Sequence, residues 1–139
     1  MAYTYKYPSP TIKFAVCECD LNNLKMINDT FGHDIGDAYI KNCCKAIRSL
    51  FSDCPVFRIG GDEFVAIMMD DNYKNLEAIK EKVFELTKSE MKRNCSLAEK
   101  KSFAAGFAVF DPANDKSFND VMKRADTEMY QHKKMLKSL

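Results

Sequence analysis

The sequence predicts an α+β domain in which helices pack on an antiparallel sheet. Three observations predict it: a mostly apolar run that ends in an acid, a glycine pair that joins two further apolar runs, and helical apolar stripes between and after these runs. In chain order they give strand, helix, strand, strand, helix, strand and a final helix. A βαββαβ core of this order is the split βαβ, ferredoxin-like arrangement, with helices on one face of the sheet.

Four segments have the composition of strands. Residues 12–19 (IKFAVCEC) are mostly apolar, as a central strand would be. Residues 56–59 and 63–69 flank the glycine pair at 60–61. Such a two-residue link predicts a type I′ hairpin turn, in which both glycines have positive φ. Residues 101–110 (KSFAAGFAVF) form the fourth strand.

Two helices are predicted in the first two thirds of the chain, beside a shorter one. Residues 37–51 place apolar side chains at helical spacing. A second helix runs to about residue 93, and Asn72 is expected to cap its start. Residues 20–37 are polar with interspersed apolar positions, which predicts a short helix and a functional loop.

A last helix is predicted from Ser117, because Asp120 three residues later completes the pattern of a capping box. It continues to about residue 137. The residues of its apolar stripe are Phe118, Val121, Ala125, Met129, His132 and Leu136.

Length and composition indicate one globular domain. The chain has 139 residues, 46% of them hydrophobic, and we expect residues 1–11 to be an irregular lead-in to a domain at 12–139. A net charge of +1 argues against general nucleic-acid binding. No apolar run approaches the roughly 18 residues of a membrane span, so we expect a cytoplasmic chain or the cytoplasmic part of a membrane-anchored sensor. The six cysteines form no CxxC pair and are expected to be reduced thiols.

The fold order brings two acids together at one edge of the sheet. The first strand ends at Asp20 and the third, its antiparallel neighbour, begins at Asp62. Converging carboxylates favour a hard divalent cation, Mg²⁺ (or Mn²⁺). Strand alternation is expected to send Asp62 and Glu63 to opposite faces, so that Glu63 has a separate task. Gly60 and Gly61 would also leave room for a ligand to approach the backbone.

Other polar residues suit a nucleotide at this edge. Lys25, which follows Asp20 by five residues, could neutralise a polyphosphate together with Lys133 and Lys137 of the last helix. An aspartate paired with an asparagine matches the edge of guanine, and Asn28 and Asp37 supply these groups in the loop after the first strand.

The same residues resemble the GGDEF domain, the diguanylate cyclase family. Residues 60–64 read GGDEF, the family signature, and residues 20–37 (DLNNLKMINDTFGHDIGD) resemble the family pattern DxDxFKxIND…GHxxGD. Ala125-Asp126, Tyr130 and Lys133 resemble the pattern ADxxxYxxK. The resemblance covers about residues 12–137 and implies a nucleotidyl-cyclase-like fold.

The resemblance implies that two GTP molecules are condensed to cyclic di-GMP with release of pyrophosphate. A homodimer would act, each subunit bringing one GTP, and a sensory domain would belong to a longer parent chain. The implied roles are Mg²⁺ binding by Asp20, Asp62 and the Leu21 carbonyl, a metal-site or general-base role for Glu63, guanine recognition by Asn28 and Asp37, and phosphate contacts by Lys25 and Lys133.

Some positions depart from the family pattern. Leu136 and Lys137 stand where the family usually has Gly-Arg, and a lysine keeps the charge but lacks the bidentate fork. Phe51 and Cys54 occupy the places of an RxxD product-inhibition site, so feedback through that site is not expected. Asn-Asn at 22–23 replaces a commoner acid and aromatic pair. The family segment that usually precedes the first strand is missing, as in an excised catalytic fragment.

Two alternatives remain open. The Lys137 departure and the missing segment would also fit a catalytically inactive, GTP-binding regulatory GGDEF module. The element order would fit an RNA-binding module of the RRM type, which needs aromatic side chains on its central strands. Phe64, Phe103, Phe107 and Phe110 could supply them, whereas the near-neutral charge and the acids at the sheet edge oppose this interpretation.

Overall fold

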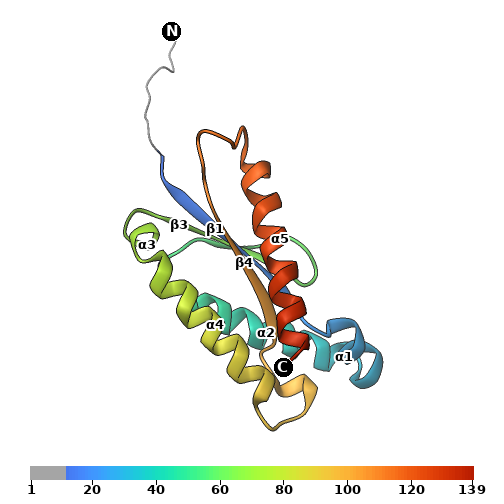
Figure 1. The fold of residues 1–139 in the computed structure, drawn as a ribbon. Coiled ribbons are helices and arrows are strands. Elements are labelled where there is room, and N and C mark those ends of the chain that lie inside the picture. The colour runs from blue at the N-terminus through green and yellow to red at the C-terminus, as the bar shows by residue number, and fades with distance from the viewer. Residues whose placement is uncertain (1–11) are drawn as a thin grey trace.

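The computed structural model describes residues 12–139, so the expected lead-in at 1–11 lies outside the described residues. The predicted order of strands and long helices is confirmed (Figure 1). The elements are β1 (Phe14–Leu21), α1 (Leu24–Phe31), α2 (His33–Leu50), β2 (Val56–Arg58), β3 (Glu63–Met69), α3 (Asp70–Lys74), α4 (Leu76–Lys92), a 3₁₀ turn (Leu97–Glu99), β4 (Phe103–Val109) and α5 (Phe118–Lys137).

The strands form one sheet in the order β2-β3-β1-β4, with every neighbouring pair antiparallel. β1 and β2 are therefore parallel to each other with β3 between them, as the split βαβ order predicts. In β1, Cys17 lies opposite Ala66 of β3 and Phe107 of β4. β1 is central, which explains its nearly continuous apolar sequence.

Helices cover both faces of the sheet. One face of β1 carries Ala15, Cys17, Cys19 and Leu21, which join the main core with residues of α2 and α4 such as Ile47 and Val83. The other face carries Val16, which packs with Val121 and Ala125 of α5. The prediction of helices on one face therefore holds for α2 and α4, and the final helix covers the opposite face.

The close packing of α5 on β4 depends on a glycine. A Cβ built on Gly106 would lie 2.1 Å from the Ala125 carbonyl oxygen and 2.2 Å from the Met129 nitrogen, both in the backbone of α5. Figure 1 shows α5 running along β4 for much of its length. This contact sets the height of α5, and hence of Lys133, above the sheet.

The predicted type I′ turn at the glycine pair is wrong. Gly32 is the one glycine in residues 12–139 with positive φ, so neither Gly60 nor Gly61 adopts that conformation. The Ile59 amide donates to the Glu63 carbonyl at 2.9 Å, so three residues rather than two lie inside the turn. The Arg58 guanidinium donates to the carbonyls of both glycines, at 3.2 and 2.8 Å.

Two helix starts also differ from the prediction. Asn72 lies within α3 and does not cap a helix, because its side-chain amide donates to the Asp53 carbonyl at 3.0 Å. α5 does begin after Ser117, but the serine side chain makes no capping bond and Asp120 accepts instead from the Lys116 amide. α2 begins at His33, earlier than predicted, so the GHDIGD segment is largely helical.

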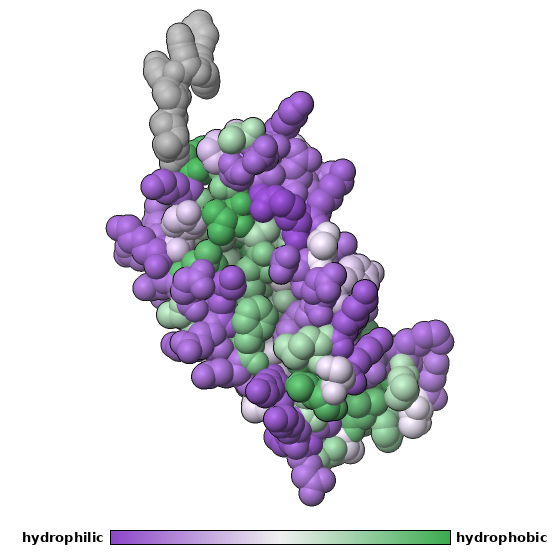
Figure 2. Space-filling view, viewed as in Figure 1, coloured by the Kyte–Doolittle hydropathy of each residue, from purple (hydrophilic) through white to green (hydrophobic). Residues whose placement is uncertain are grey.

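Within residues 12–139 no helix is long and apolar enough to cross a membrane. Hydrophilic side chains cover most of the face in Figure 2, with smaller apolar areas between them. All six cysteines are free, and Cys17, Cys19 and Cys43 are buried, as expected for reduced thiols that pack as small apolar residues.

Candidate active site

Three carboxylates meet at one edge of the sheet. Asp20 near the end of β1, Asp62 just before β3 and Glu63 at the start of β3 each place one oxygen within 4.8 Å of the others. The register pairs Asp20 with Glu63, and the Leu21 amide donates to the Asp62 carbonyl at 2.8 Å. The predicted meeting of Asp20 and Asp62 is confirmed.

The expectation that Asp62 and Glu63 serve opposite faces is wrong. Their carboxylate oxygens belong to the same cluster. Alternation applies to residues within a strand, but β3 begins only at Glu63, so Asp62 belongs to the turn and its direction is not set by the pleat.

Asp20 is the most buried acid of the three-carboxylate cluster, with 9% of its surface exposed. Its Oδ2 accepts from Lys133 Nζ at 2.7 Å, whereas its Oδ1 is buried and has no hydrogen-bond partner among residues 12–139. Burial raises the pKa of Asp20 although the Lys133 ammonium acts to lower it. Burial also raises the pKa of Glu63, and the neighbouring Asp20 and Asp62 carboxylates add to that increase.

The chemistry of this cluster fits a divalent cation. A buried carboxylate oxygen without a hydrogen-bond partner is uncommon in folded proteins, and a bound cation would satisfy it. The three carboxylates repel one another at this distance, and a hard cation between them would stabilise their charged form. Carboxylate oxygens are ligands that suit Mg²⁺ or Mn²⁺.

Glu18 is a further acid of this region that the motifs did not single out. It is only 4% exposed and lies on the same face of β1 as Asp20. The pKa of Glu18 is raised to about 8. Burial is the largest cause, and the hydrogen bond to Asp126 and the repulsion between the two acids add to it. An acid two residues before Asp20 in an apolar strand was the signal that could have identified it.

The predicted phosphate-binding lysines separate into two groups. Lys133 and Lys137 line one small cleft of about 130 Å³ with Asn22, Asn23, Met91 and Leu136. Lys25 instead forms an exposed ion pair with Asp29 on α1, with 2.9 Å between Nζ and Oδ2. The structure therefore brings Lys133, but not Lys25, to the carboxylates.

The predicted glycines differ in their surroundings. A Cβ on Gly60 would lie 3.2 Å from Glu63 Oε1, whereas one on Gly61 would meet nothing within 4 Å. Gly60 therefore lies against the cluster and Gly61 faces open space, where a ligand could approach its backbone.

The two predicted guanine-reading residues come from adjacent helices. Asn28 lies on α1 and is half-buried, and Asp37 lies on α2 and is exposed. The Asn28 amide lies against Gly36, where an added Cβ would lie 1.7 Å from Asn28 Oδ1. Because Gly36 immediately precedes Asp37, this contact brings Asn28 beside the turn of α2 that carries Asp37.

Comparison with known proteins identifies the family. A family model described as "Diguanylate cyclase, GGDEF domain" matches residues 6–138. The chain belongs to the GGDEF domain family. The family resemblance stated from the sequence motifs is thereby confirmed.

Relatives of this GGDEF domain include signalling proteins and cyclases. The signaling protein YkoW of Bacillus subtilis is 34% identical over 123 residues, which cover 86% of this chain and 15% of YkoW. Diguanylate cyclase DgcP of Escherichia coli is 27% identical over 88% of this chain and 36% of its own length. The GGDEF domain therefore spans about a third or less of these two relatives.

Solved structures confirm the fold. The active GGEEF domain of a diguanylate cyclase from Vibrio cholerae has a TM-score of 0.70 at 25% identity, over 88% of this chain and 78% of that one. The GGDEF domain of DgcB from Caulobacter crescentus, in complex with c-di-GMP, has a TM-score of 0.69 at 27% identity, over 88% and 73%.

The RNA-binding alternative is not supported by the placement of its aromatic residues. Phe64, Phe103 and Phe107 are at most 9% exposed and belong to the core beneath α2 and α4. Phe110 stacks on Phe14 with 5.0 Å between ring centroids. Rings held in this way are not available for stacking with bases on an open sheet.

Proposed function

We propose that this GGDEF domain is a diguanylate cyclase that condenses two GTP molecules into cyclic di-GMP and releases two pyrophosphates. The observation that carries the proposal is the convergence of Asp20, Asp62 and Glu63 beside Lys133. A cluster of hard acidic ligands next to a lysine is what a nucleoside triphosphate with its divalent cation requires.

Within the site, Asp20, Asp62 and Glu63 would hold Mg²⁺ or Mn²⁺ with the Leu21 carbonyl. When bound, the cation neutralises the triphosphate and polarises the reacting oxygens. Glu63 has the raised pKa of a carboxylate that could also accept the proton of the 3′-hydroxyl. Lys133 balances the charge on Asp20 and would also contact the phosphates.

Substrate recognition would use the two adjacent helices and the cleft beside α5. Asn28 and Asp37 would bind the guanine edge. Lys137, which lines the same cleft as Lys133, would bind phosphate as a point charge without the bidentate fork of an arginine. Lys25 would have to leave Asp29 to reach a phosphate; their exposed ion pair is weak enough to allow this.

The condensation needs two domains. In each half-reaction a 3′-oxygen of one GTP bonds to the α-phosphorus of the other, the bond from that phosphorus to the β-phosphate bridge breaks, and pyrophosphate leaves with the electron pair. A homodimer with one GTP per domain would bring the two reactants together. We also propose that a sensory domain in a cytoplasmic parent chain controls this encounter, since GGDEF relatives such as DgcP are much longer.

The direct test is incubation of the purified domain with GTP and Mg²⁺, followed by chromatography of the products. We expect cyclic di-GMP from the wild type and none from Asp62→Ala. Asp34→Ala, which removes an exposed acid at the start of α2, is the matched control and should keep the activity. No product from wild type, even when two domains are fused to a dimerising coiled coil, would contradict the proposal.

A second candidate is a regulatory module that binds GTP without turnover, and the lysine at position 137 favours it. GTP with Mg²⁺ would then raise the melting temperature of wild type while no cyclic di-GMP accumulates. A melting temperature unchanged by GTP and Mg²⁺ would contradict this candidate.

A further inference from the structure

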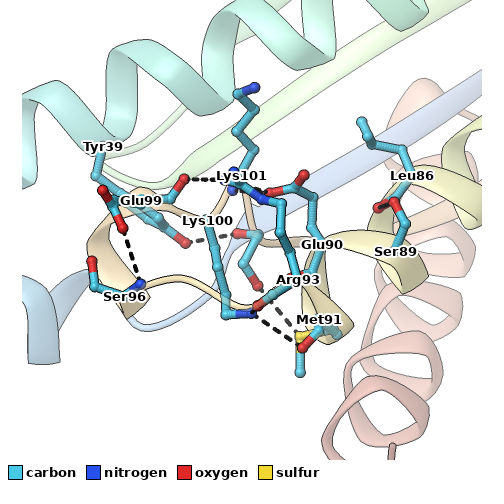
Figure 3. A network of polar contacts seen from close by, with 11 residues as sticks. Tyr39, Leu86, Ser89, Glu90, Met91, Arg93, Ser96, Glu99, Lys100 and Lys101 are labelled. Carbon is cyan, nitrogen blue, oxygen red and sulfur yellow. Dashed lines mark hydrogen bonds and ion pairs between the residues drawn. The ribbon is translucent and has the colours of Figure 1, made fainter.

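A buried tyrosine outside the family motifs contacts Asn22, which lies two residues after Asp20, and Ser102, which precedes β4. Tyr39 of α2 is 1% exposed, and its hydroxyl lies 2.6 Å from the Asn22 carbonyl oxygen and 2.9 Å from the Ser102 carbonyl oxygen. Burial raises the pKa of Tyr39 above its ordinary value, so the hydroxyl stays a donor. Figure 3 shows Tyr39 reaching from its helix toward the segment of Lys100 and Lys101.

Asn22 is held by Ser102 as well as by Tyr39. Its backbone amide donates to the Ser102 carbonyl at 3.0 Å, and its side-chain amide donates to Ser102 Oγ, also at 3.0 Å. The Ser102 hydroxyl in turn donates to the Met91 sulfur at the end of α4. The residue after Leu21 is therefore tied to α2, to α4 and to the segment that enters β4.

These contacts determine which way the Leu21 carbonyl points. In a trans peptide the carbonyl and the following N–H point in opposite directions. The Asn22 N–H is directed at Ser102, on the β4 side of β1, so the Leu21 carbonyl is directed to the β3 side. The Leu21 amide bonds to the Asp62 carbonyl on that same side.

The chain leaves β1 through a short turn at Asn22 and Asn23. Asn23 has φ 66° and ψ 16°, the left-handed region that asparagine adopts more readily than most other residues with a side chain, and α1 starts immediately after it. Asn22 is bound through both its N–H and its carbonyl. The Leu21 carbonyl is left on the β3 side of β1, the side of Asp62.

We propose that Tyr39, acting with Ser102, is a positioning residue for the cation site. Its hydroxyl contacts the carbonyls of Asn22 and Ser102 and so holds together the two residues whose backbone bond, from the Asn22 N–H to the Ser102 carbonyl, orients the peptide between Leu21 and Asn22 with the Leu21 carbonyl on the side of Asp62. This inference rests on the proposed function, in which that carbonyl is a ligand. Neither residue touches the cation or the substrate. Both act through Asn22, as groups that orient metal ligands in other proteins do.

The test measures Mn²⁺ affinity by electron paramagnetic resonance, in the presence of α,β-methylene-GTP, which cannot release pyrophosphate. We expect Tyr39→Phe to weaken Mn²⁺ binding by about tenfold, the lower end of the usual effect of such orienting groups. Ser102→Ala, which removes only the hydroxyl partner of Asn22, should weaken it in the same direction by less. With GTP and Mg²⁺, Tyr39→Phe should need more Mg²⁺ for half-maximal rate but recover near wild-type kcat at saturation.

Tyr73→Phe is the matched control, because Tyr73 is partly buried against the same core and lies far along the chain on α3. It should leave Mn²⁺ affinity unchanged, which separates the loss of the Tyr39 hydroxyl from the loss of a tyrosine hydroxyl elsewhere in the domain. Unchanged Mn²⁺ affinity in Tyr39→Phe would overturn the positioning role. Failure of wild type to make cyclic di-GMP would overturn the proposed activity alone, since the Mn²⁺ measurement needs no turnover.

Discussion

Lys133 Nζ lies 2.7 Å from Asp20 Oδ2, and this ion pair joins α5 to the end of the central strand across 113 residues of sequence. The two side chains are 23% and 12% exposed, so water screens the pair only partly. Because the second oxygen of Asp20 is buried without a partner, Lys133 is the main group that compensates this carboxylate in the absence of a cation.

Replacing Lys133 should therefore remove a phosphate contact and also change the protonation of Asp20. In Lys133→Met the pKa of Asp20 should rise further, because the ammonium that lowers it is gone. We expect the rate of cyclic di-GMP formation to fall by about 100-fold, as when one charge-stabilising group is removed from an active site. Lys134→Met removes a neighbouring exposed lysine and should change the rate little; an equal loss in both variants would contradict this explanation.

The packing of α5 on β4 predicts a strong stability effect at Gly106. In Gly106→Ala the new methyl group would overlap the backbone of α5 at Ala125 and Met129, which cannot move away as a side chain could. We expect the free energy of unfolding to fall by about 3 kcal/mol, measured by urea denaturation. Gly61→Ala is the control for stability, since its added methyl group meets nothing within 4 Å, and it should cost less than about 0.5 kcal/mol.

The sequence predicted those features that follow from element order. Asp20 and Asp62 had to meet, because antiparallel neighbours bring the end of one strand beside the start of the next. The buried face of α5 was predicted well except at its first residue. Phe118 of the predicted stripe is 47% exposed, and the buried members are Val121, Ala125, Met129, His132 and Leu136. Both results depend only on periodicity and topology, which the order of residues determines directly.

Features that depend on local competition were predicted less well. Lys25 pairs with Asp29 four residues on, a local contact that the motif did not indicate, and its contact with phosphate stays a prediction. The glycine pair was expected to have positive φ, but the Arg58 guanidinium holds the two carbonyls in another turn. The contact between Tyr39 and Ser102 joins residues 63 positions apart, and no periodic pattern encodes such a pairing.

His132 predicts a pH dependence of stability. It is 7% exposed, its Nδ1 accepts from the Ala105 amide at 2.9 Å, and burial lowers its pKa. Below the unfolded pKa of about 6.5 the unfolded chain binds a proton that the folded chain does not, so this contribution to stability is lost as pH falls through the folded pKa. The loss is at most about 1.4 kcal/mol per pH unit.

We expect His132→Asn to lose less stability than wild type when the pH is lowered from about 7 to about 5, in urea denaturation with a chelator present. The raised pKa values of Glu18 and Glu63 act in the opposite direction, but they act in both proteins and cancel in the comparison. His33→Asn changes an exposed histidine and should keep the wild-type profile. Identical profiles for wild type and His132→Asn would show that His132 does not titrate as described.

The contact of Asn28 with Gly36 predicts an effect on nucleotide affinity at a residue that has no side chain of its own. In Gly36→Ala the new Cβ would lie 1.7 Å from Asn28 Oδ1, so the amide must leave its place beside Asp37. We expect the Kd for GDP, measured by calorimetry with Mg²⁺, to rise by about tenfold, because a hydrogen bond to the base is lost at a cost of ~1.4 kcal/mol. Asn28→Ala should raise the Kd by a similar factor.

The double variant distinguishes a local effect from a general one. If Gly36→Ala acts only by displacing Asn28, then Gly36→Ala combined with Asn28→Ala should bind GDP no more weakly than Asn28→Ala alone. Additive losses would mean that the methyl group disturbs α2 and Asp37 directly. That result would contradict the explanation that the contact of Asn28 with Gly36 positions the amide for guanine.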